Sequence, residues 1–248
     1  MNAEEVFLDY TEAFDNTLGK IRLKIYHTMK VAEVMDELTK RLELSDHVRE
    51  LAHYTAVFHD IGRFEQVRKY DTFNDKISED HAAIGCRVLT ENNILKELSE
   101  EDQEKVLTAI KNHNQYVIEE GLDEETLTLC KLIRDADKID ILRVFATEDP
   151  VDTMGESLEQ VEAEVISDDV YERIMNHQQI PKSIRKTGLD FWIGFLGFIF
   201  DLNYPESRAI IREQDHYRRR FLQAQFKNEE TRERVANVLE EIGLCLEA

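Results

Sequence analysis

Residues that break helices are scarce in this sequence. Its 248 residues include only 3 prolines and 9 glycines. Few segments alternate apolar and polar residues with the period of two that a half-buried strand requires, whereas many repeat apolar residues with the 3.6-residue period of an α-helix. We therefore expect a fold that is all-α.

Cysteine and long apolar segments are scarce as well. The three cysteines are far apart, odd in number and form no CxxC pair, which indicates free thiols in a reducing compartment. The N-terminus lacks the basic and apolar regions of a signal peptide. The most apolar segment, residues 189–202, carries two aspartates and is shorter than the roughly 20 apolar residues of a membrane span. We expect a cytoplasmic protein without a membrane partner, in which this segment is a buried helix.

Positive charge is in deficit. The 31 Lys and Arg residues against 52 Asp and Glu residues give a formal net charge of −21. Such a charge repels a phosphate backbone, which argues against nucleic acid as a partner. A small phosphorylated substrate stays compatible with it, because a divalent metal and a few local cations reverse the field inside a pocket.

The apolar periodicity and the capping residues place the helices of the N-terminal part. They are expected at residues 3–16, 21–42, 46–60, 80–91, 100–113 and 124–146. Ser45 and Ser99 offer N-caps, and Gly62 fits the C-terminal cap of the third helix. Residues 63–79 are polar without a clean period, which predicts a loop, with at most a short turn of helix.

The C-terminal part is also helical by pattern. It includes the apolar helix within residues 188–202 and a long charged helix that begins near Pro205. We expect a core of residues 1–148 and a helical extension of residues 149–248 packed on it.

Four polar residues interrupt the expected apolar helix faces: His27, the adjacent His59 and Asp60, and Asp137. An ionised carboxylate at a buried helix end is costly unless a cation compensates its charge. Imidazole and carboxylate together suit Zn, Fe, Mn, Ni or Co. Each residue alone has an ordinary alternative, namely a helix cap, a hydrogen-bonded core histidine, or an aspartate paired with a neighbouring cation.

In combination these residues resemble the HD superfamily of metal-dependent phosphohydrolases. The matching phrases, in the family's order, are His27-Thr28, Phe58-His59-Asp60-Ile61-Gly62 and Asp135-Ala136-Asp137-Lys138. The resemblance covers roughly residues 20–147 of the chain. It implies an HD-domain helical bundle in which His27, His59, Asp60 and Asp137 hold a divalent metal ion, a transition metal or Mg²⁺.

Two further histidines are similar to ligands of family members that bind two metals. His81 begins the phrase HAAIGCRVL, and His113 lies at the end of an expected helix in IKNHNQY. The resemblance implies that Asp60 bridges two ions and that both histidines complete the second site. In the alternative, one ion binds and the two histidines contact the phosphate or the attacking water. The other histidines, at positions 47, 53, 177 and 216, are assigned no role.

The resemblance implies that the metal activates a water molecule for attack on phosphorus. Arg63, three residues after Asp60, is expected to bind the phosphate and to act with Asp60 in catalysis. Arg68 and Lys138 are weaker candidates for substrate binding. Glu65 is expected as a general acid or base, although its spacing differs from that of other HD phosphohydrolases. An ordinary surface position is the alternative for each of the three cations.

The reaction subtype stays open. The phrase HDIGRF lacks the paired acids of (p)ppGpp hydrolases, and NHNQYVIEEGL lacks the GYP phrase of cyclic dinucleotide phosphodiesterases. DADKID is similar to a phrase of small stand-alone HD hydrolases, some of which act on nucleotides. We expect hydrolysis of a phosphoester or phosphoanhydride bond in a nucleotide or another small metabolite. The alternatives are a non-catalytic metal-containing module that binds a nucleotide or a protein, and a helical interaction protein; a homodimer is compatible with all three.

Overall fold

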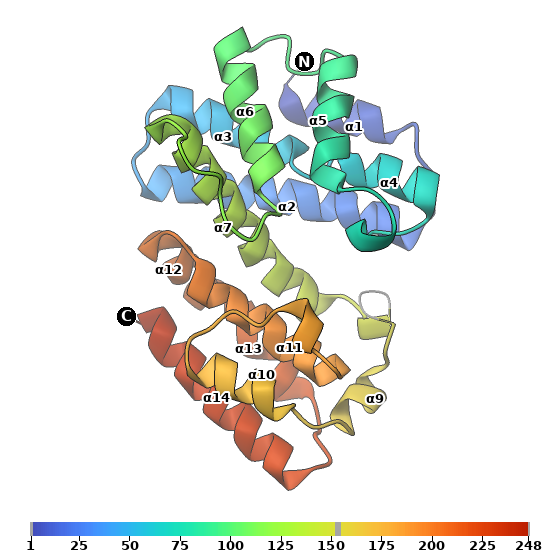
Figure 1. Ribbon diagram of the computed structural model, residues 1–248, viewed down its shortest axis with the longest axis vertical. Helices are drawn as coiled ribbons and strands as arrows, with labels where there is room; N and C mark the ends of the chain where they lie inside the picture. Colours follow the sequence, from blue (N-terminus) through green and yellow to red (C-terminus); the bar gives the residue numbers. More distant parts are fainter. Residues whose placement is uncertain (1, 152–154, 248) are drawn as a thin grey trace. The chain divides into compact units, whose positions relative to one another are not determined.

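The protein is helical throughout the part of the chain that the computed structural model describes, residues 2–151 and 155–247. No β-strand occurs among these residues, and the expected all-α fold class is confirmed (Figure 1). None of the described helices combines the length and the apolar character that a membrane span requires.

Contacts along the chain divide it into two compact units, residues 1–137 and residues 138–248. The division falls inside helix α7 (Glu124–Thr147), between its Asp137 and Lys138. The domain boundary predicted between residues 148 and 149 lies just after this helix and stays a prediction.

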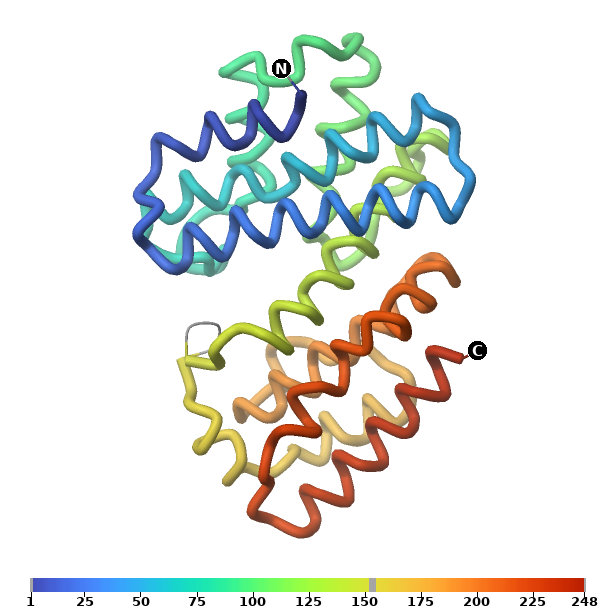
Figure 2. Tube along the Cα trace, turned by 180° about the vertical axis from the view of Figure 1, so that it is seen from behind, coloured from blue at the N-terminus to red at the C-terminus, as the bar shows by residue number. Residues whose placement is uncertain are grey.

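The first unit is a bundle of short and long helices. They are α1 (Ala3–Thr11), α2 (Gly19–Arg41), α3 (Asp46–Phe58), α4 (Gly62–Tyr70), the 3₁₀ turn η1 (Asp75–Ile77), α5 (His81–Glu91), α6 (Glu100–Asn112) and the first part of α7. Helix α2 lies along α3, α4 packs on α5, and α6 contacts both α3 and α5 (Figure 2). The N-caps predicted for α3 and α6 are confirmed, because the hydroxyls of Ser45 and Ser99 accept hydrogen bonds from backbone N–H groups in the first turns.

Helix α4 replaces about the first half of the predicted loop, and the prediction of a loop over residues 63–79 was wrong there. Phe64 and Val67 are buried on one face of this helix. The ring of Phe64 contacts those of Phe7 and Phe14, with centroids 5.7 and 5.4 Å apart. Polar residues between and around these two apolar positions hide the helical period, so tertiary packing rather than local pattern decides the structure of this segment.

The sequence predicted that Gly62 caps helix α3, but Gly62 begins α4 instead. Helix α3 already ends at Phe58. A Cβ atom on Gly62 would collide with the carbonyl oxygen of His81 and the amide nitrogen of Gly85. Glycine is therefore needed here because α4 and the start of α5 approach backbone to backbone, which brings His81 close to the end of α3.

The second unit is built around aromatic residues. Its elements are the rest of α7, α9 (Leu158–Glu162), α10 (Asp168–Met175), η2 (Lys182–Ile184), α11 (Gly188–Leu196), η3 (Gly197–Asp201), α12 (Pro205–Gln214), α13 (His216–Gln223) and α14 (Glu229–Glu247). Trp192 of α11 is fully buried, and its ring contacts Phe145, Phe221 and Phe226. The apolar segment of residues 189–202 is thus core, as expected, although it ends in a 3₁₀ turn.

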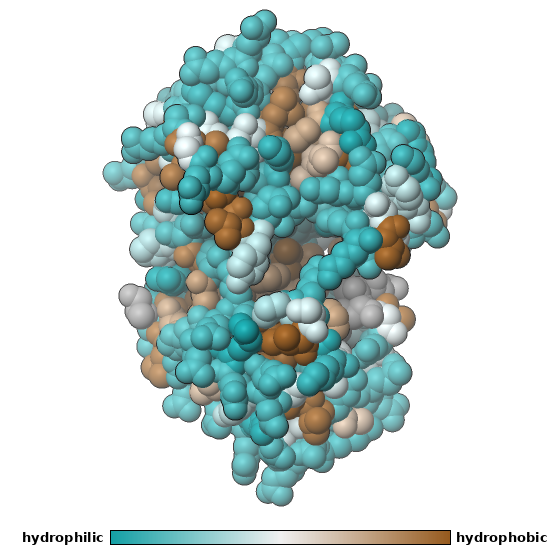
Figure 3. Space-filling model, viewed as in Figure 1, coloured by the Kyte–Doolittle hydropathy of each residue, from teal (hydrophilic) through white to brown (hydrophobic). Residues whose placement is uncertain are grey.

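The long charged helix predicted from Pro205 is instead three helices. Asp215 has a φ of 56° and separates α12 from α13, and the segment between Gln223 and Glu229 separates α13 from α14. Aspartate tolerates the left-handed region better than most residues, so the chain turns there without glycine. On the face drawn in Figure 3, hydrophilic side chains predominate and apolar residues form only scattered patches.

Candidate metal centre

All six predicted metal ligands come together in the first unit. His27 lies within α2, His81 is the first residue of α5, and Asp137 lies in α7. His59 and His113 directly follow α3 and α6, the two helices that pack on one another. Five of the six side chains are buried, and the side chain of Asp137 is 19% exposed. The helical bundle thus converges on one polar centre.

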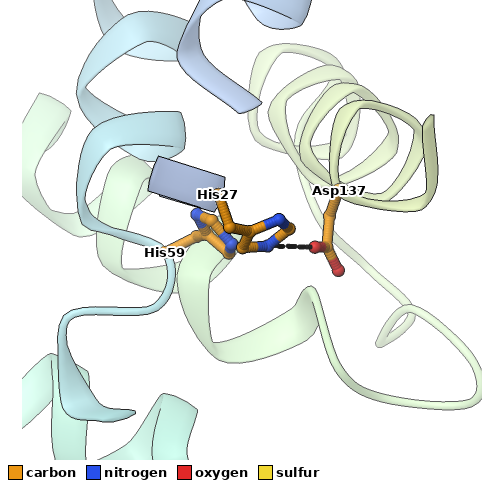
Figure 4. Close-up of side chains that lie close together, drawn as sticks. All are labelled: His27, His59 and Asp137. Atoms are coloured by element: carbon orange, nitrogen blue, oxygen red, sulfur yellow. Dashed lines mark ion pairs between the residues drawn. The ribbon is translucent and has the colours of Figure 1, made fainter. Parts of the chain in front are cut away.

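His27, His59 and Asp137 form the first group of ligand atoms (Figure 4). The Nε2 atom of His27 lies 3.0 Å from Oδ1 of Asp137. The same oxygen lies 3.8 Å from Nε2 of His59. The two imidazole rings meet edge to face, with centroids 5.5 Å apart. The Nε2 atoms of both rings face the carboxylate of Asp137.

Asp60, His81 and His113 form the second group. The Nε2 atoms of the two histidines are 3.1 Å apart. Oδ1 of Asp60 lies 3.3 Å from Nε2 of His81 and 3.9 Å from Nε2 of His113.

Asp60 also faces the first group with its other oxygen. Its Oδ2 atom lies 3.8 Å from Nε2 of His27 and 3.6 Å from Nε2 of His59. One carboxylate therefore presents one oxygen to each pair of histidines, which is the arrangement that a bridging ligand between two ions requires.

Hydrogen bonds fix the tautomer of three of the histidines. Nδ1 of His59 lies 2.7 Å from the carbonyl oxygen of Ala56, and Nδ1 of His113 lies 2.6 Å from that of Ile110. A carbonyl only accepts, so each Nδ1 carries the proton and each neutral ring keeps its lone pair on Nε2. Both rings follow a helix end and bond back to the carbonyl three residues earlier.

His81 reaches the same protonation state through a carboxylate. Its Nδ1 lies 2.8 Å from Oδ2 of Asp75, a residue just before α5. Burial alone would raise the pKa of Asp75, but its hydrogen bond with His81 and the charge of Arg63 lower that pKa below its usual value. The ionised carboxylate accepts a hydrogen bond from Nδ1–H of His81, and His81 also directs an Nε2 lone pair into the centre.

Nε2 atoms that carry lone pairs consequently face other acceptor atoms at the centre. The Nε2 atoms of His81 and His113 face each other, and Nε2 of His59 has no hydrogen-bond partner within the described residues. Acceptors held at such distances repel unless a cation lies between them. Ligand atoms about 2.1 Å from one ion are about 3.0 to 3.4 Å apart at right or tetrahedral angles, close to the shorter separations here. The donor set fits a divalent metal ion.

Electrostatics keep the ligands in the form that binds metal. Burial lowers the pKa of His59, His81 and His113, so these rings stay neutral near neutral pH. Burial would raise the pKa of Asp60, but surrounding positive charge, that of Lys24 foremost, holds this pKa well below its usual value. Burial would raise the pKa of Asp137 as well, but its hydrogen bond with His27 and the electrostatic effect of His27 and His59 together lower this pKa.

Two residues at the centre were missed by sequence reasoning. Nζ of Lys24 lies 2.6 Å from Oδ2 of Asp60, and its only sequence signal is the i, i+3 spacing to His27 on α2. Asp75 lies in the segment expected as a loop, where nothing in its spacing singled it out. Buried Gln66 donates a 2.7 Å hydrogen bond to Asp75 and fixes its position.

Arg63 lies beside the candidate metal ligands, but its guanidinium already has partners. Its Nε is 3.4 Å from Oδ1 of Asp60. Its Nη1 donates to Gln66, Asp75 and the carbonyl oxygen of Phe73, at 2.9, 3.0 and 2.7 Å. Arg63 therefore ties the segment before α5 to α4, and its predicted roles in catalysis and phosphate binding stay predictions.

The other predicted substrate and catalytic residues have different partners. Glu65 and Arg68 pair with each other at 2.5 Å, and Glu65 accepts a 3.2 Å hydrogen bond from the hydroxyl of Tyr10. Lys138 forms an ion pair with Asp201 of the second unit. The structure groups neither Glu65 nor the two cations with the metal ligands, and their functional roles stay predictions.

Comparison with known proteins identifies the class. The HD domain family model matches residues 25–142, a segment that contains all six candidate ligands. Residues 25–142 are thus an HD domain, which confirms the resemblance inferred from the sequence. No curated protein and no solved structure matches the chain significantly.

Proposed function

We propose that this HD domain is a metal-dependent phosphohydrolase that acts on a small phosphorylated metabolite, with a nucleotide as the first candidate. One observation carries the proposal. Three neutral imidazoles direct their Nε2 lone pairs at one another and at the ionised carboxylate of Asp60, inside a family whose chemistry is mostly phosphate hydrolysis. Only a cation makes that arrangement favourable.

The ligand geometry supports a centre for two ions of Mn, Fe, Ni, Co or Zn. His27, His59 and Asp137 would hold one ion, His81 and His113 the other, and Asp60 both. Such ions polarise phosphate oxygens and lower the pKa of bound water. Mg²⁺ is less well matched, because it prefers oxygen ligands and water over imidazole.

The chain itself contributes orientation and charge. The carbonyl oxygens of Ala56 and Ile110 and the carboxylate of Asp75 hold the ligand rings in one tautomer. Lys24, whose side chain is 19% exposed, places an ammonium group beside Asp60, where it can bind a phosphate oxygen. The net charge of −21 favours small substrates over polyanions.

A metal-supplemented screen of phosphorylated metabolites tests the proposal. Protein freed of metal is resupplied with each ion in turn, and release of phosphate or pyrophosphate is measured. His59→Ala should lose at least about 100-fold of the activity, since it removes a ligand. His53→Ala is the matched control, because His53 lies on the preceding helix α3 and pairs with Asp36 at 3.0 Å. It should keep full activity.

Two results would overturn the proposal. If His59→Ala were as active as the unchanged protein, the measured hydrolysis would not belong to this centre. If the protein bound metal yet released neither phosphate nor pyrophosphate from any compound, the non-catalytic metal-containing module would be the better account.

A further inference from the structure

A separate group of potential metal ligands, which includes a cysteine, lies in the second unit, on residues that the HD family match does not include. It consists of His177, Glu241 and Cys245. Nε2 of His177 lies 2.6 Å from Oε1 of Glu241 and 3.4 Å from Sγ of Cys245. Glu241 and Cys245 are one turn apart on α14 and share a face, and His177 follows the end of α10, which packs on α14.

The geometry does not fit a nucleophilic cysteine. In a Cys–His–acid relay the acid and the nucleophile take opposite ring nitrogens. Here both approach the same Nε2, which cannot donate to the carboxylate and accept from the thiol at once. Burial and the charge of Glu241 raise the pKa of Cys245, so the thiol stays protonated without a cation beside it.

The backbone and one ring contact fix the orientation of the histidine. His177 has a φ of 55° because it is the left-handed residue that ends α10, where the backbone N–H groups of His177 and Gln178 bond back to the carbonyl oxygens of Ile174 and Arg173. Its ring stacks on Phe200 of η3, with centroids 5.1 Å apart and planes inclined by 21°. The stacking and the turn together direct Nε2 toward the face of α14.

We propose that His177, Glu241 and Cys245 form a zinc site that links the turn after α10 to the C-terminal helix α14. Nitrogen, oxygen and thiolate sulfur are the donors that Zn²⁺ takes in proteins. A nitrogen and a sulfur on one tetrahedral zinc ion are about 3.6 Å apart, close to the separation of Nε2 and Sγ. The half-exposed His177 side chain leaves a fourth position for water.

Cobalt spectroscopy tests this site separately from the HD centre. Co²⁺ bound to a thiolate gives a charge-transfer band in the near ultraviolet, which needs a sulfur ligand. The six ligands of the HD centre offer only nitrogen and oxygen, so they cannot produce the band. The unchanged protein should show it on titration with Co²⁺, and Zn²⁺ should abolish it.

Matched variants assign the band. Cys245→Ser and His177→Asn should remove it; asparagine tolerates the left-handed conformation that position 177 needs. Cys86→Ser should keep it, since Cys86 is also only partly buried but contacts the carbonyl oxygen of Leu107. Absence of the band in the unchanged protein, or a band that persists in Cys245→Ser, would overturn the proposal.

A stability measurement supplies a second readout. In a His59→Ala background, Zn²⁺ should raise the urea midpoint of the protein, and adding Cys245→Ser should make that increase smaller. An equal increase with and without Cys245 would show that zinc acts elsewhere and would contradict the site.

Discussion

Asp60 in the first unit and Asp190 in the second are both buried carboxylates, yet their partners differ in kind. Asp190 accepts hydrogen bonds from the backbone N–H groups of Ser167, Lys186 and Thr187 and from the hydroxyl of Ser167, at 2.7 to 3.3 Å. Asp60 contacts two cationic side chains, but it also faces imidazole nitrogens that carry lone pairs.

The chemical type of its partners distinguishes a buried carboxylate at a binding site from one with a structural role. Asp190 has an N–H or O–H donor for each contact described above, so the fold alone compensates its burial. The centre around Asp60 brings together acceptors that the fold leaves facing one another. Burial of charge is therefore no sign of function by itself; the chemical type of the neighbours decides.

The same isosteric substitution, Asp to Asn, should impair metal binding at position 60 and stability at position 190. The larger effect is expected at Asp60. Asp60→Asn removes the negative charge between the two histidine groups, so metal affinity and phosphohydrolase activity should each fall by at least about 100-fold. Metal titration followed by calorimetry measures the metal affinity. An Asp60→Asn protein that still binds two ions tightly would break the comparison.

Asp190→Asn should instead cost stability and leave metal binding unchanged. An amide NH₂ would face N–H donors that now bond to the carboxylate, which should lower the free energy of unfolding by about 3 kcal/mol. Urea unfolding followed by circular dichroism provides the measurement. Unchanged stability would show that Asp190 is not the structural counterpart of Asp60.

Asp75→Asn sharpens the comparison inside the first unit. Asparagine keeps one acceptor oxygen, which should take the position of Oδ1 because Arg63 and Gln66 donate there. An NH₂ group would then face Nδ1 of His81, so metal affinity should fall by about 10- to 100-fold. Asp71→Asn, in the same segment but paired with Lys20 at the surface, should bind metal as the unchanged protein does. Equal affinity in both variants would mean that the tautomer of His81 does not matter.

Acidification should release metal from the centre. Only the neutral imidazoles bind metal, and burial lowers the pKa of His59, His81 and His113. Neutral rings therefore persist below the ordinary histidine pKa of about 6.5, and affinity should stay level down to about that pH. Below the lowered values it should fall by at least about tenfold per pH unit. A loss that begins above about pH 7.5 would require raised pKa values instead.

The sequence was sufficient to predict the helices with regular apolar faces and to single out six candidate ligands that the structure brings together. The order of the phrases around His27, His59 and Asp137 carried the ligand prediction, because no residue was convincing alone. Helix α4 was missed because its buried face includes only a few apolar residues, Phe64 and Val67 among them, between charged neighbours. Gly62 was read as a cap because local sequence cannot reveal a close approach to another helix.

Residues that act through other residues were beyond the reach of sequence. Asp75 positions His81 through a contact that the turn before α5 creates, and Lys24 reaches Asp60 from a different helix. Glu65 and Arg68 stand near the HD phrase in sequence, yet the helix directs them to each other and to Tyr10. Proximity in sequence thus singled out residues that the structure does not group with the six candidate ligands, and it overlooked others that lie beside them.

Six side chains that converge in the first unit are proposed to hold metal. The most direct test is the metal content of Cys245→Ser protein, which lacks the sulfur ligand of the second unit, purified without chelator and measured by native mass spectrometry. The account predicts about two transition-metal ions per folded chain, both lost on denaturation. A folded chain that contains no ion, and takes none up from solutions of Mn²⁺, Co²⁺ or Zn²⁺, would contradict it.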